Sequence, residues 1–195
     1  MEQVQATTRL QAGLRRAAWL WLGAVLAVAA NAAEPRFEIR NAFAEPVAGV
    51  WQLNAILDLG LSQPARDALG QGIPLTLVLD ILVTRERRLL PDVDVAELQQ
   101  RWQLAYDALS SRYVVTNQNS GAQSTYPGLD DALTALARVR NLPMIDANLL
   151  EAGRRHDVSI RASVEIGGMP EAVKLLIFWR EWSRSTDWYA WSIRP

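Results

Sequence analysis

Strict alternation of apolar and polar residues is the feature that most constrains how this chain can fold. The cleanest run covers residues 157–166, where an apolar residue stands at every even position from Val158 to Ile166. A longer run has an apolar residue at every odd position from Ile73 to Val83, and a third covers residues 49–61. Because successive side chains of a strand point to opposite faces, all three patterns predict half-buried strands.

Further strands are predicted around these three. Residues 98–109 also alternate, residues 112–126 have the pattern of a hairpin that turns near Gly121, and residues 187–195 form a closing strand. Strands in hairpin order favour antiparallel pairing over repeated strand–helix–strand units. We therefore predict a mainly β fold, either an antiparallel β-sandwich or a two-layer α+β domain, with two or three short helices.

The predicted helices are short. One stripe of apolar residues has helical spacing before Pro143: Leu129, Ala132, Leu133, Leu136 and Val139. Two shorter helices are predicted, one after a Ser62 cap within residues 62–72 and one at residues 146–153. Residues 169–182 combine a helix-start proline, Pro170, with an apolar run that predicts burial or membrane contact.

The N-terminal segment has the pattern of a secretory signal peptide. Arg9, Arg15 and Arg16 precede an apolar run over residues 17–30, and Ala30 and Ala32 fit a cleavage site. This predicts a cleavable signal peptide at residues 1–32 and a single periplasmic strand-rich domain at residues 33–195. The alternative is an uncleaved segment that anchors the protein in the inner membrane, although a membrane span needs about 20 apolar residues.

The charge balance excludes one class of partner. Removal of residues 1–32 takes one acidic and three basic residues from totals of 21 and 20, which leaves a net charge of −3. A mildly acidic domain without a dense basic tract lacks the surface that binds phosphate backbones, so we predict no nucleic-acid partner. The chain also has no cysteine, which excludes disulfides and thiol chemistry.

Motifs for catalysis are missing from the sequence. His156 is the single histidine, and we predict an exposed or capping role for it. Asp92 and Asp94 lack the further ligands of a calcium loop, and we interpret them as a solvated connection between strands. No nucleophile elbow or phosphate-binding loop is present. We therefore predict no catalytic, metal-binding or cofactor-binding residues, and the sequence favours a non-enzymatic protein.

Aromatic residues are concentrated near the C-terminus, where four of the eight tryptophans lie: Trp179, Trp182, Trp188 and Trp191. Exposed aromatic rows bind sugars or sit at membrane surfaces, whereas buried tryptophans of a sandwich give the same sequence pattern. Trp51 and Trp102 on inward strand faces favour the core, but the four remain candidate ligand-binding residues. Trp188 and Trp191 differ by three positions and should face opposite sides of a strand.

Two motifs carry a family resemblance: R-Y-V-V-T-N from Arg112 to Asn117, and S-x-D-W-Y from Ser185 to Tyr189. With "YPGLDDALTALARVRNLP" between them, they resemble a family of exported proteobacterial proteins catalogued as domain of unknown function 4390. The resemblance covers nearly the whole mature chain and supplies no catalytic residue. It implies envelope signalling or maintenance beside a membrane sensor histidine kinase. The chain departs from the family in "MPEAVKLL", where the family is richer in proline.

The predicted function is a non-enzymatic interaction module of the cell envelope, whose partner is an envelope or inner-membrane protein. Two alternatives stay open. One is a lipid- or glycan-binding domain that uses the C-terminal aromatic residues and contacts the membrane surface. The other is a hydrolase with an unrecognised serine or carboxylate site.

Overall fold

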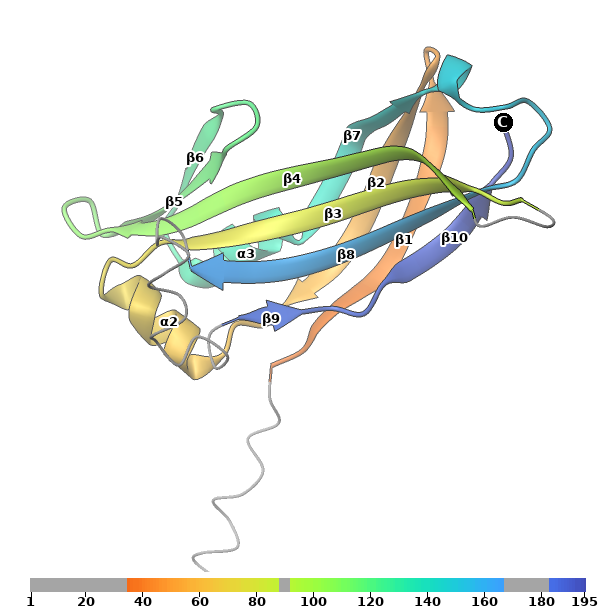
Figure 1. The fold of residues 1–195 in the computed structure, drawn as a ribbon. Coiled ribbons are helices and arrows are strands. Elements are labelled where there is room, and N and C mark those ends of the chain that lie inside the picture. The colour runs from red at the N-terminus through yellow and green to blue at the C-terminus, as the bar shows by residue number, and fades with distance from the viewer. Residues whose placement is uncertain (1–34, 88–91, 167–182) are drawn as a thin grey trace, which may run out of the picture. The chain divides into compact units, whose positions relative to one another are not determined.

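Two antiparallel β-sheets make up the part of the chain that the computed structural model describes, which is residues 35–87, 92–166 and 183–195 (Figure 1). The predicted mainly β fold with antiparallel pairing is confirmed. The predicted signal peptide and residues 169–182 lie outside the described residues. None of the described helices is long and apolar enough to span a membrane.

The smaller sheet has three strands in the order β1 (Phe37–Val47), β2 (Val50–Leu59) and β7 (Arg138–Asp146). Ala48 and Gly49 join β1 to β2 with φ angles of 50° and 85°, the left-handed pair that a two-residue hairpin turn needs. A register shift between Ile39 and Asn41 interrupts the alternation of β1. This interruption explains why the sequence pattern did not predict that strand.

The large sheet has the order β10–β8–β3–β4–β5–β6, with β9 paired to β8 beside β10. Its strands are, in chain order, β3 (Leu75–Arg85), β4 (Val93–Asp107), β5 (Arg112–Asn117), β6 (Gln123–Tyr126), β8 (His156–Ile166), β9 (Arg184–Ser185) and β10 (Tyr189–Ile193). The two runs of strictest alternation, β3 and β8, lie side by side at its centre. The hairpin of β5 and β6 was also predicted correctly.

Short helices connect the strands. α2 (Gln63–Gly70) begins at the predicted cap, where the Ser62 hydroxyl accepts the Ala65 N–H at 3.4 Å. α3 (Leu129–Leu136) carries Asp130 and Asp131 in its first turn, where negative charge suits the helix dipole. A single 3₁₀ turn follows β7 at Ala147–Leu149 and replaces the helix predicted at residues 146–153.

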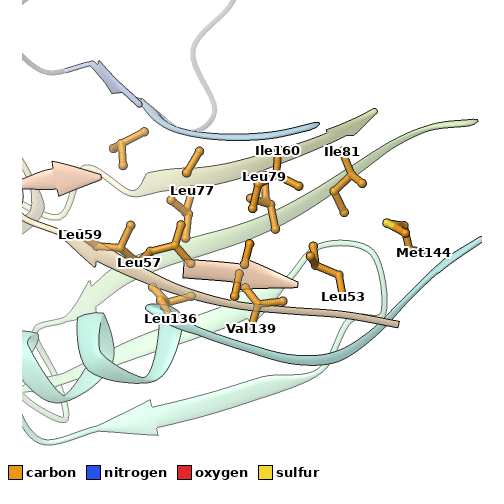
Figure 2. Close-up of a cluster of buried hydrophobic side chains, with 14 of the residues drawn as sticks. Leu53, Leu57, Leu59, Leu77, Leu79, Ile81, Leu136, Val139, Met144 and Ile160 are labelled. Atoms are coloured by element: carbon orange, nitrogen blue, oxygen red, sulfur yellow. The ribbon is translucent and has the colours of Figure 1, made fainter. Parts of the chain in front are cut away.

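The core lies between the inner faces of the two sheets. Figure 2 shows Leu53, Leu57 and Leu59 from β2 opposite side chains of β3 and β8. The fully buried side chains include Leu53, Leu79 and Ile160. The alternation along these strands thus supplies one apolar face to each sheet, as the sequence predicted.

The predicted helical stripe up to Val139 is wrong beyond Leu136. α3 ends there, because the Leu57 N–H donates to the Ala137 carbonyl at 2.9 Å and the chain continues as β7. Val139 pairs with Ala55 of β2 and is 7% exposed. Sheet pairing and burial therefore override the helical spacing at this point.

Gly60 is expected to be intolerant of a side chain. A Cβ at this position would lie 2.5 Å from the Arg36 carbonyl oxygen and from the Pro35 Cβ. Gly60→Ala should lower the free energy of unfolding by about 1–2 kcal/mol, because backbone has to move to relieve the overlap. Urea unfolding followed by fluorescence measures the loss.

Gly70 offers the matched control, because a Cβ there would meet no atom of the described residues within 4 Å. Gly70→Ala should stay within about 0.5 kcal/mol of the parent protein. Equal losses for the two substitutions would contradict the close approach at Gly60.

Candidate functional site

A row of polar side chains crosses the outer face of the large sheet, on the side away from the core. Arg161 on β8, Asp80 on β3 and Gln99 on β4 are direct neighbours in the strand register. The Arg161 guanidinium donates to one carboxylate oxygen of Asp80 at 3.1 Å, and the Gln99 amide donates to the other at 2.7 Å. Both oxygens of Asp80 are therefore held by the neighbouring strands.

A second link crosses the same face. Arg101 on β4 donates to Glu165 on β8 at 3.2 Å and to the Gln99 side chain at 2.8 Å. Because β3 lies between β4 and β8, the Arg101–Glu165 ion pair passes over β3. Val78 on the outer face of β3 is only 2% exposed, as expected beneath such a cover. The two links hold the polar side chains in place before anything binds.

A bulge in the C-terminal tail places Trp188 beside this row. Ser185 of β9 pairs with Ser163, and Tyr189 of β10 pairs with Ile160, so three tail residues oppose two residues of β8. An extra residue in one strand bends it and re-aims the side chains. Trp188, the last residue of the bulge, immediately precedes β10.

Thr186 closes the bulge with its side chain. Its hydroxyl accepts the Ala162 N–H at 3.1 Å and donates to the Asp187 carbonyl at 2.8 Å. The Trp188 ring then lies over Arg161, with the guanidinium carbon 4.7 Å from the ring centroid. This is a cation–π contact, and it leaves Trp188 46% exposed.

These side chains line a groove of about 540 Å³. Its walls carry four carboxylates, those of Asp80, Asp94, Glu97 and Glu165, against the guanidinium of Arg161. Asp94 and Glu97 are exposed, and neither has a hydrogen bond or ion pair through its side chain within the described residues. Even with Arg101 counted, the groove is net negative.

Two of the four candidate tryptophans lie within the described residues, and these two do not share a surface. Trp188 lies in the groove, whereas Trp191 is half-buried on the inner side of β10 and contacts Tyr189, with ring centroids 6.0 Å apart. The predicted opposite orientation of Trp188 and Trp191 agrees with these positions. Trp179 and Trp182 lie outside the described residues. Ligand binding by the four stays a prediction.

His156 corrects another expectation. It is fully buried rather than exposed, with Nδ1 3.2 Å from the Arg154 carbonyl oxygen and no partner for Nε2 among the residues that the structure describes. His156 pairs with Arg85 of β3 and Ile193 of β10, so the core of the large sheet encloses the ring. A substrate has no access to this imidazole in the described structure.

Within residues 35–87, 92–166 and 183–195, no group of three or more His, Cys, Asp or Glu side chains could hold a metal ion.

Two aspartates lie at the ends of β4 and accept local hydrogen bonds. Asp92, just before β4, accepts the Arg87 N–H at 3.2 Å. At the β4–β5 turn, the Ser110 hydroxyl and the Leu109 N–H lower the pKa of the exposed Asp107.

Sequence reasoning missed the groove because it needs the strand register. The alternation placed Asp80 and Arg161 on the outer faces of their strands, but it did not show that β3 and β8 are neighbours. One signal was present in the sequence. Arg161 and Glu165 are long charged residues among smaller polar ones on the outer face of β8. Residues of complementary charge, Asp80 and Arg101, lie on the outer faces of β3 and β4.

The structure defines the class of protein as an antiparallel two-sheet β domain with a preorganised polar groove on one sheet face. The chain belongs to the family described as Domain of unknown function (DUF4390), whose family model matches residues 34–192. The resemblance carried by the two sequence motifs is confirmed. The comparisons with curated proteins and with solved structures gave no match.

Proposed function

We propose that this protein is a non-enzymatic interaction module of the cell envelope, exported to the periplasm, which binds a basic segment of an envelope or inner-membrane protein. The polar groove of the large sheet is the proposed binding surface. The observation that carries the proposal is the excess of carboxylates in a groove whose central side chains are already held in place.

The charges of the groove indicate the chemistry of the partner. Asp80 and Glu165 are neutralised by Arg161 and Arg101, so the free negative charge lies at Asp94 and Glu97. Opposite charge on a partner raises the rate of association and fixes its orientation. A segment with one or two lysine or arginine residues therefore fits this end of the groove.

Trp188 supplies an apolar contact beside the charges. Arg161 covers one part of the indole, and the ring remains about half exposed. Tryptophan is enriched among the residues that dominate binding energy at protein interfaces. The side chain is already positioned by the bulge, which reduces the entropy lost when a partner binds.

The export part of the proposal is supported by the N-terminal sequence pattern. Basic residues, an apolar run and small residues before Ala33 have the order of a signal peptide. A link to a membrane sensor kinase is part of the same proposal and rests on the family resemblance. The alternative of a retained inner-membrane anchor leaves the groove proposal unchanged.

Site-specific crosslinking in the native host tests the proposal. A photoreactive benzoylphenylalanine in place of Leu82, which lines the groove, should give a discrete crosslink to one envelope protein. The same substitution at Ile56 is the matched control, because Ile56 is an exposed apolar residue on a strand of the other sheet. Mass spectrometry of the product should also find a mature N-terminus near Ala33.

Charge reversal adds a test of the chemistry. Glu97→Lys should reduce the Leu82 crosslink by about tenfold, since one close ion pair to a partner contributes about 1.4 kcal/mol or more. Glu38→Lys reverses an exposed strand carboxylate of the smaller sheet and should leave the yield unchanged. Crosslinks from Leu82 to peptidoglycan strands instead of protein would replace the proposal with the glycan-binding alternative. Equal crosslinking from Ile56 would reject the groove.

A further inference from the structure

A second hollow lies on the inner side of the large sheet, where β4, β5 and β6 face α3 and the start of β7. Its volume is about 180 Å³. The apolar part of its wall is formed by Trp102, Val115, Tyr126, Leu136 and Val139. A cavity of about 150 Å³ lined by aliphatic and aromatic side chains accommodates a benzene-sized molecule. This hollow therefore has room for part of an apolar chain.

A wider outer depression lies next to the inner hollow. Its volume is about 600 Å³, and the two share Tyr126, Ala135 and Arg138 in their walls. Arg140 lines the outer depression only. A largely apolar hollow thus adjoins a depression that is lined by two arginines.

Both arginines are available to a ligand. Arg138 and Arg140 are exposed, and within the described residues neither side chain has a hydrogen bond or ion pair. Asp131 is the acidic side chain of the outer wall, and its carboxylate lies close to Gly128 at the N-terminus of α3. Among the residues that the structure describes, Asp131 forms no ion pair with either arginine, and two guanidinium groups against one carboxylate leave the outer depression net positive. The outer depression therefore favours an anion, although the chain without residues 1–32 is acidic as a whole.

We propose that these two hollows form a binding site for a linear fatty carboxylate. The apolar chain enters between Trp102, Leu136 and Val139, and the carboxylate is bound by Arg138 and Arg140. Guanidinium groups match a carboxylate with paired N–H donors. The site uses none of the groove side chains, so it is independent of the proposed protein interaction.

Calorimetric titration of the purified mature protein with dodecanoate, below its micelle concentration, tests this site. We expect saturable binding with a negative heat-capacity change, which marks burial of apolar surface. Arg138→Gln and Arg140→Gln should each weaken binding by about tenfold, because each removes one charge-assisted contact to the carboxylate. Ala135→Phe places a large side chain at a residue that lines both hollows and should abolish binding.

Arg112→Gln is the matched control, because Arg112 is an exposed strand arginine of β5 that lines neither hollow. It should bind dodecanoate like the parent protein. The glutamine variants replace exposed side chains and should keep the parent's thermal unfolding midpoint, so a loss of binding reports on the site. Absence of saturable dodecanoate binding overturns the proposal, as does equal affinity for dodecanol. Binding only to phosphatidylglycerol vesicles would also overturn it, in favour of surface attachment.

Discussion

Leu53→Ala is expected to lower the free energy of unfolding by about 3–4 kcal/mol. Leu53 has no exposed surface and lies on β2, the central strand of the smaller sheet, where its side chain packs between the two sheets (Figure 2). The truncation removes buried methyl groups and leaves a cavity that β2 cannot close, because both of its neighbours in the sheet hold it in register. Urea unfolding followed by far-UV circular dichroism measures the change.

The matched control is the same substitution at a position outside the core. Leu109, in the turn between β4 and β5, is fully exposed at 100%. Leu109→Ala should change the free energy of unfolding by less than about 0.5 kcal/mol. The chain has no disulfide, so apolar burial between the sheets carries much of its stability. A loss below about 1 kcal/mol at Leu53 would show that the two sheets do not pack as described.

Strands β3 and β8, with strict alternation, were predictable, whereas β1 and β7, whose alternation is interrupted, were not. β3 and β8 keep one apolar face over their whole length, and both were identified from the sequence. β1 and β7 carry register shifts, which put two successive residues on one face and break the period of two. In β7, Pro143 also suggested the end of a helix rather than an irregular edge strand.

The binding surfaces depend on contacts that the sequence pattern does not contain. Asp80, Arg101 and Arg161 come together only because β4, β3 and β8 are neighbours, and sequence alternation does not give the order of strands. The fatty-carboxylate site likewise needs α3 to end before Val139, the residue that was assigned to the helical stripe. The prediction failed where tertiary contacts decide the local structure.

The two faces of β8 have different roles: one packs in the core and stabilises the fold, and the other lines the proposed binding groove. Its even-numbered residues, such as Ile160 and Val164, are buried in the core, whereas Arg161 and Glu165 lie in the groove. Substitutions on the outer face should therefore alter binding with little effect on unfolding. Thr186 is an exception, because this one residue both closes the sheet edge and positions Trp188.

Thr186→Val is expected to lower the free energy of unfolding by about 2–3 kcal/mol. Valine has nearly the same shape, but it cannot accept the Ala162 N–H, which belongs to a fully buried residue of β8. A buried donor that loses its partner costs about 1–3 kcal/mol, and the hydrogen bond to the Asp187 carbonyl is lost as well. The tail should loosen around the bulge. Hydrogen exchange should then report faster exchange at Ala162 and along β10 than in the parent protein.

Thr125→Val is the matched control, because Thr125 is an exposed threonine on the edge strand β6 and its hydroxyl has no partner among the described residues. It should stay within about 0.5 kcal/mol of the parent protein. Thr186→Val should also reduce the proposed groove interaction, since Trp188 loses the bulge that holds it over Arg161. Lower stability with unchanged binding would show that the Arg161 contact alone positions the indole. Unchanged stability would contradict the role of the hydroxyl in closing the sheet edge.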